Sequence, residues 1–61
     1  MFIEVRDRMQ GRDVLINTDR IEWIKPENGG RTARIYLMSG AEIETDLPYV
    51  SLFVKLEKVI A

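Results

Sequence analysis

The fold of this chain is decided by one stretch of sequence, Arg34-Ile35-Tyr36-Leu37-Met38-Ser39-Gly40-Ala41-Glu42-Ile43-Glu44. Apolar and polar side chains alternate on both sides of Ser39-Gly40, which predicts two strands joined by a tight turn. A two-residue loop would place Tyr36 opposite Ile43, whereas a three-residue loop that begins at Met38 places Ile35 there instead. Only the longer loop pairs side chains of like character throughout, and it gives Gly40 the left-handed conformation that such a loop requires. We therefore predict an antiparallel hairpin with the three-residue loop.

The residues before this hairpin also have strand character. Residues 2–8 and 32–37 alternate between apolar and polar side chains, and residues 13–17 and 21–25 are two further short strands bounded by turn residues. Three consecutive apolar residues at 14–16 leave the register of the second strand open. The connections are short and local, which favours antiparallel neighbours over a parallel sheet.

Residues from about 47 to 60 have the periodicity of an amphipathic helix. Asp46 is the expected N-cap, and Pro48 suits the first turn because its missing N–H has no partner there. At 100° per residue, the expected core face contains Tyr49, Leu52, Phe53, Leu56, Val59 and Ile60. The opposite face contains Ser51, Lys55 and Lys58. Val50 and Val54 widen the apolar stripe, either as half-buried edges of one core or as a subunit contact.

Composition restricts the chemistry available to the chain. It has 61 residues, 46% hydrophobic and 31% charged, with a formal net charge of −1 and neither Cys nor His. Their absence excludes disulfides, thiolate nucleophiles, imidazole base catalysis and the usual zinc ligands. The sequence lacks an apolar run of membrane-spanning length and a signal peptide pattern, so we expect a cytoplasmic protein. A chain this short has little core, and association between subunits is one way to compensate.

The fold class that follows is α+β. We expect an antiparallel meander of four to five short strands packed against one C-terminal helix, with residues 1–61 forming a single small domain.

Carboxylates recur at a spacing of two at Glu42, Glu44 and Asp46. They suit either a site for a hard cation or a solvated face in which Glu44 lies opposite Arg34. We favour the solvated face, because the sequence lacks the ligand spacing of a calcium loop. Residues 28–31 predict a hairpin turn and not a phosphate cradle, since a strand follows them. We expect no enzyme activity, no cofactor and no metal site.

The aromatic and basic residues Trp23, Arg34 and Tyr36 form a candidate contact surface. Arg34 and Tyr36 are expected to face outward. The spacing of Ile21 and Ile24 leaves the direction of Trp23 open, and we favour the core over the outer face. An outward Trp23 would suit protein contacts or base stacking. Acidic residues interleave with the basic ones, which argues against a nucleic-acid interface.

The assembled pattern resembles the FlbD-like family of small bacterial flagellar and swarming-motility proteins. The residues that carry the resemblance are Gly11, Leu15-Ile16-Asn17-x-Asp19-x-Ile21-Glu22-x-Ile24, Ile35-x-Leu37-x-Ser39-Gly40 and Leu56-Glu57-Lys58-Val59-Ile60. The connection at residues 27–30 is longer than the family pattern. The resemblance implies a cytoplasmic, non-catalytic accessory role in motility, with no catalytic residues to carry over. The chain is less similar to the β-rich part of LytTR DNA-binding domains, being shorter and less basic.

We therefore expect a small non-enzymatic interaction or assembly protein that binds a protein partner or associates with itself through the helix or a sheet edge. The candidate interaction residues are Trp23, Arg34, Tyr36, Val50 and Val54. The alternative is a small nucleic-acid-binding regulatory module that uses the Arg/Tyr/Trp face. We expect neither membrane insertion nor a small-molecule substrate.

The Asn17 side chain is predicted to accept hydrogen bonds from backbone N–H groups of the following turn. Asn17→Ala should then lower the free energy of unfolding by about 1 kcal/mol. Thermal or urea melting measures this change, and an unaltered midpoint in the variant would contradict the assignment.

Overall fold

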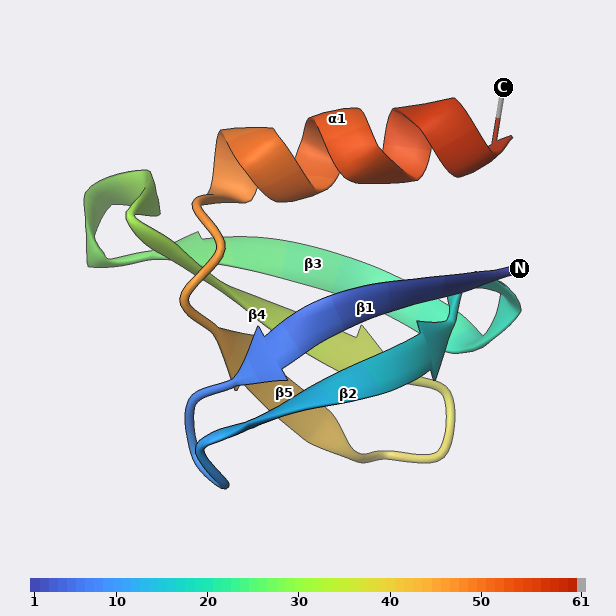
Figure 1. Ribbon diagram of the computed structural model, residues 1–61, viewed down its shortest axis with the longest axis horizontal. Helices are drawn as coiled ribbons and strands as arrows, with labels where there is room; N and C mark the ends of the chain where they lie inside the picture. Colours follow the sequence, from blue (N-terminus) through green and yellow to red (C-terminus); the bar gives the residue numbers. More distant parts are fainter. Residues whose placement is uncertain (61) are drawn as a thin grey trace.

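The computed structural model describes the backbone of residues 1–60 and the side chains of residues 1–58. Five antiparallel strands form one curled sheet, and a single helix lies over it (Figure 1). The strands are β1 (Phe2–Asp7), β2 (Arg12–Asn17), β3 (Ile21–Glu27), β4 (Thr32–Leu37) and β5 (Glu42–Thr45). Short 3-10 turns occupy Thr18–Arg20 and Asn28–Gly30, and helix α1 spans Tyr49–Ile60. The predicted α+β class is confirmed.

The strand order across the sheet is β2-β1-β5-β4-β3. Each hairpin joins strands that are neighbours in the sequence, but the turn at Thr18–Arg20 leads from one edge of the sheet to the other. The sheet therefore has two halves, the β1–β2 hairpin and the β3–β4–β5 unit, with β2 and β3 at its edges.

The β4–β5 hairpin has the predicted three-residue loop. Ile35 lies opposite Ile43, and Tyr36 lies opposite Glu42. The N–H of Leu37 donates to the carbonyl of Ala41 at 2.9 Å. Gly40 has φ 93°, the left-handed conformation for which glycine is favoured. Matching the character of opposing side chains was sufficient to set this register.

The β1–β2 pairing resolves the register that the sequence left open. Ile3 lies opposite Ile16, and Val5 lies opposite Val14, so these side chains share the inner face of the sheet. Leu15, between two inward residues, points outward and is 67% exposed.

A β-bulge in β3 decides the direction of Trp23. Ile21 lies opposite Leu37 and Trp23 opposite Tyr36, so one extra residue, Glu22, is accommodated on the β3 side. The bulge changes the alternation of side chains, and Ile21 and Ile24 both pack against the core. Trp23 is 48% exposed, so the favoured interpretation of it as a core residue is wrong.

Helix α1 starts later than predicted, and Asp46 is not its N-cap. The N–H of Leu52 donates to the carbonyl of Pro48 at 3.0 Å, so Pro48 directly precedes the first turn. Asp46 lies before this point, and its carboxylate forms an ion pair with Arg8, whose Nε is 2.8 Å from Oδ1 of Asp46. The Asp46 carboxylate therefore has the guanidinium of Arg8 as its charged partner.

The helix packs on the inner face of the sheet through a narrower stripe than periodicity indicated. Leu52 is buried with Ile35, while Tyr49 and Leu56 are partly buried against the same core. Phe53 was predicted to face the core and is instead 56% exposed. The predicted core residues Val59 and Ile60 lie outside the residues whose side chains are described. The remaining buried core residues are Ile3, Val5, Ile16 and Ala33.

The two halves of the sheet meet at a short seam between β1 and β5. Asp7 lies opposite Thr45, and both side chains are buried. Beside this pair, the N–H of Arg8 donates to the carbonyl of Glu44 at 2.8 Å. Oδ1 of Asp7 also accepts from the N–H of Met9 at 2.9 Å, so the same residue shapes the β1–β2 turn.

Asn17 has the predicted role. Its Oδ1 accepts from the N–H of Asp19 at 3.0 Å, which caps the 3-10 turn that follows β2.

Asp7→Ala should lower the free energy of unfolding by about 1–3 kcal/mol, because it leaves the turn N–H groups without their buried acceptor. Asp7→Asn keeps an acceptor oxygen at the same place and should cost less. Urea melting of both variants measures the difference. Equal losses for Ala and Asn would show that the acceptor at this position does not hold the turn.

Candidate interaction surfaces

The outer face of β3 and β4 carries a stacked aromatic pair. The Trp23 and Tyr36 rings lie parallel, with their centroids 4.1 Å apart and an interplanar angle of 2°. They are opposite each other in the ladder, and cross-strand aromatic pairs of this kind stabilise a sheet. The structure therefore brings together these two candidate residues, and Trp23 keeps its other ring face available to solvent or to a partner.

Arg34 lies on the same outer face, but its guanidinium already forms ion pairs with three carboxylates. Its Nε is 3.1 Å from Glu27, one terminal nitrogen is 3.3 Å from Glu42, and the other is 3.4 Å from Glu44. The predicted pairing of Arg34 with Glu44 is confirmed. The hydrogen bond from Arg34 lowers the pKa of Glu27, and the same contact raises the pKa of Arg34.

This arrangement weakens the case for nucleic-acid binding. A cation surrounded by three glutamates must give up those contacts before it pairs with phosphate. Lys25, on the neighbouring strand, is also 3.6 Å from Glu27. The outer face is thus an aromatic pair bordered by a carboxylate-rich cluster, which suits contacts with a protein better than contacts with a polyanion.

A second surface lies on the side of α1 that faces away from the sheet. Val50 is 70% exposed, Phe53 56% and Val54 43%. We call these three residues the outer helix patch. Sequence reasoning singled out the two valines but assigned Phe53 to the core. The sequence does not show which side of the helix the sheet covers. In the structure the sheet covers the side that carries Leu52 and Leu56.

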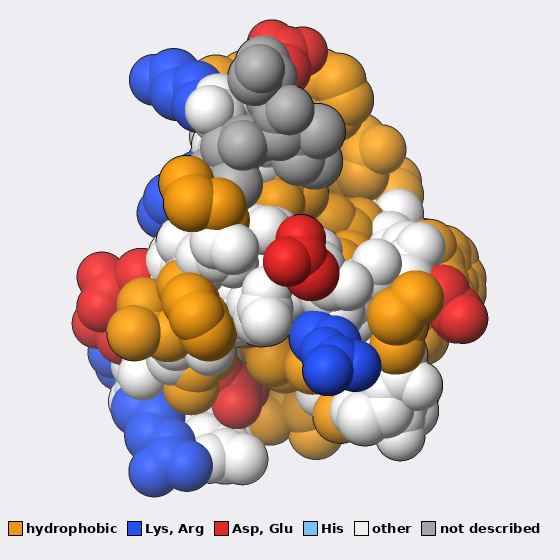
Figure 2. Space-filling view, turned by 90° about the vertical axis from the view of Figure 1, so that its right-hand side faces the viewer, with side chains coloured by type: hydrophobic (Ala, Val, Ile, Leu, Met, Phe, Trp, Pro, Cys, Tyr) orange, Lys and Arg blue, Asp and Glu red, His pale blue; other side chains and the backbone are white. Residues whose placement is uncertain are grey.

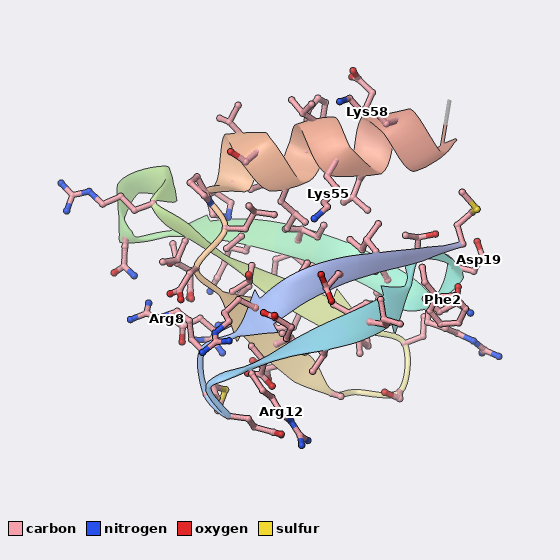
Figure 3. All side chains as sticks on the ribbon, in the orientation of Figure 1. Phe2, Arg8, Arg12, Asp19, Lys55 and Lys58 are labelled. Atoms are coloured by element: carbon pink, nitrogen blue, oxygen red, sulfur yellow. The ribbon has the colours of Figure 1, made fainter. Side chains whose placement is uncertain are left out.

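Lys55 shows how the helix is rotated relative to the sheet. It was predicted to lie on the side opposite the core, yet it points from α1 toward β1, whereas Lys58 points away (Figure 3). Nζ of Lys55 donates to the backbone carbonyl of Glu4 at 2.9 Å. This rotation turns Phe53 out to solvent, so the outer helix patch becomes continuous.

A groove that the sequence did not predict runs along β2. It encloses about 640 Å³ between β2 and the β4–β5 hairpin. Its apolar lining consists of Val14, Leu15, Ile16, Leu37, Met38, Ala41 and Ile43. Charged side chains, Arg12 and Glu42 among them, border it. No periodicity reveals such a groove, because it depends on how the two halves of the sheet curl around each other.

Exposed hydrophobic side chains are found on several elements. Apart from the outer helix patch and Trp23, they are Met1, Phe2, Met9, Leu15 and Met38. On the side of the molecule seen in Figure 2, hydrophobic side chains reach the surface in several places between charged ones. Within the described residues, no group of three or more acidic side chains is placed to hold a metal ion. The described part of the chain also lacks a helix of the length and hydrophobicity needed to cross a membrane.

Glu27→Gln should lower the melting temperature more at about pH 6 than at about pH 3. Glu27 binds its proton more weakly in the folded state than in the unfolded state. Its contribution to stability is therefore present above the ordinary value of 4.5 and is lost as the pH falls through the lowered pKa. Thermal melts of the two proteins across this range test the expectation.

Glu22→Gln is the matched control, since Glu22 is exposed and has no ion pair among residues 1–58. If the difference in melting temperature between wild type and Glu27→Gln did not depend on pH, the stabilising role assigned to the Glu27–Arg34 ion pair would be contradicted.

Comparisons of the chain with protein-family models, with curated proteins and with solved structures give no match. The resemblance to FlbD-like proteins stays a prediction.

Proposed function

We propose that this chain is a small non-enzymatic interaction protein that docks onto a protein partner through exposed apolar surface. The outer helix patch is the observation that carries the proposal. A helix that packs on a sheet normally exposes its polar side, but here Val50, Phe53 and Val54 face solvent on the side away from the core. Apolar residues gathered in this way are typical of sites that another macromolecule covers.

The charged groups support a binding role in preference to catalysis. Arg8 is paired with Glu44 and Asp46, and Arg34 with its three glutamates. These side chains are held in ion pairs near the surface, whereas general acid–base catalysis relies on groups held in a cleft with a pKa near the working pH. The groove beside β2 has an apolar lining of the kind that receives a side chain or a strand.

From the sequence resemblance we propose that the cellular role of this chain is an accessory one in flagellar or swarming motility. FlbD-like proteins are accessory proteins of flagellar and swarming motility, and a cytoplasmic docking role of this chain would agree with that activity. The structure adds a physical reason for such a role, namely an apolar helix surface on a domain too small to cover it.

Val50→Asp should abolish capture of the partner from an extract of the native host. A carboxylate within the outer helix patch would be buried without a counter-ion in the complex. Ser51→Asp is the matched control, because it adds the same charge in the same first turn of α1, where a carboxylate interacts favourably with the helix dipole.

The measurement is the amount of each captured protein, compared among wild type and the two variants after melting curves show all three folded. A protein that is retained by wild type and Ser51→Asp but lost from Val50→Asp supports the proposal. Equal retention by the three proteins, or no specific capture by wild type, overturns it.

A further inference from the structure

Strand β2 has one edge that is already paired and one that is free. Among the described residues, β2 pairs with β1 alone. The N–H of Thr18 donates to the carbonyl of Met1 at 2.8 Å, so position 18 belongs to a hydrogen-bonded pair of this ladder. Because such pairs alternate along antiparallel strands, the even-numbered residues of β2 direct their backbone groups to β1. Asp13, Leu15 and Asn17 consequently direct theirs to the free edge.

The other edge of the sheet is protected, and β2 is not. Strand β3 carries the bulge between Ile21 and Trp23, and Pro26 offers no N–H. Bulges and prolines are the usual means by which edge strands avoid pairing with another chain. Strand β2 has six residues, no bulge and no proline, and its centre is Val14-Leu15-Ile16.

We propose that a second copy of this chain adds to the free edge of β2, so that two β2 strands pair antiparallel about a twofold axis at Leu15. The inference rests on the proposed interaction role and names a partner for a surface other than the outer helix patch. Leu15 then lies opposite Leu15 of the second copy, Val14 opposite Ile16, and Asp13 opposite Asn17. The pairing joins two five-stranded sheets into one continuous sheet.

The pattern of β2 permits this register and opposes its neighbours. Centring the axis on Val14 would place Asp13 opposite Leu15, and centring it on Ile16 would place Leu15 opposite Asn17, so an apolar side chain would lie opposite a polar one in both registers. Centring it on Asp13 would place two aspartates directly opposite each other, which is destabilising. Centring it on Asn17 would pair Leu15 with Asp19, which lies in the 3-10 turn and not in a strand. Only the register at Leu15 keeps apolar residues opposite apolar residues on both faces.

The groove beside β2 gives the second copy a place for its side chains. Val14 and Ile16 of the incoming strand point to the inner face, where Leu37 and Ile43 line the groove. On the outer face, the two exposed Leu15 side chains cover each other. A seam of one strand is small compared with a standard interface, so the dimer should be weak, with a dissociation constant in the micromolar range.

Sedimentation equilibrium of the full chain tests the association, and Leu15→Pro tests the edge. Proline at position 15 removes only an N–H that points away from β1, so the hairpin should survive. We expect wild type to dimerise and Leu15→Pro to weaken dimerisation roughly tenfold or more.

Leu15→Cys tests the register without relying on proline. The natural chain has no cysteine, so each variant carries a single thiol. In a hydrogen-bonded antiparallel pair, the Cα atoms are about 5.5 Å apart, which is within the range that a disulfide spans. Leu15→Cys should therefore form a disulfide-linked dimer on mild oxidation. Asp13→Cys is the matched control on the same strand and edge, but its two thiols would be separated along the seam.

Rapid cross-linking at position 15 together with slow cross-linking at position 13 supports the proposal. A strictly monomeric wild type, a dimer that Leu15→Pro leaves unchanged, or cross-linking at position 13 as fast as at position 15 overturns it. The two proposals fail separately, because a monomer that still captures a partner through Val50 retains the interaction role and loses only the β2 pairing.

Discussion

The contact between Asp7 and Thr45 holds the two halves of the sheet together. Each hairpin is stabilised by neighbours in the sequence, but β1 and β5 are joined only over this short seam. Asp7 supports both sides, because its carboxylate binds the turn after β1 while its backbone lies against β5. Arg8 adds ion pairs to Glu44 and Asp46 at the same place, so charge pairing and main-chain pairing coincide.

The shortness of the seam explains the position of the helix. Toward the N-terminus from Asp7, β1 is not paired with β5, and apolar residues on the inner face of the sheet would be exposed to water without a further element. Helix α1 supplies Leu52 to that space, and Lys55 satisfies the carbonyl of Glu4, which faces away from β2. The orientation set by these two contacts leaves the outer helix patch facing solvent. The same divergence leaves the groove open between β2 and the β4–β5 hairpin. The outer helix patch and the groove beside β2 therefore both follow from the short pairing of β1 with β5.

The parts of the fold that follow from local pattern were predictable, and those set by long-range contacts were not. The β4–β5 register follows from matching Ile35 with Ile43, and the Asn17 cap follows from the chemistry of its side chain. The direction of Trp23 depends on a bulge that forms only when β3 meets β4. The exposure of Phe53 depends on the sheet beneath the helix. Of the candidate site, periodicity placed Val50 and Val54 outside the main apolar stripe but left open whether they were half-buried edges of the core or a subunit contact, whereas the groove needs three elements to be in place.

The seam also bears on the order in which the protein folds. The β1–β2 and β4–β5 hairpins close loops of a few residues, whereas Asp7 and Thr45 are separated by most of the sequence. Contacts between residues distant in the sequence carry the larger loop-closure entropy and form slowly. We therefore expect the β1–β2 and β4–β5 hairpins to form before β1 docks on β5. During that interval the inner faces of both hairpins are open to water, which makes the joining of the halves the stage most vulnerable to aggregation.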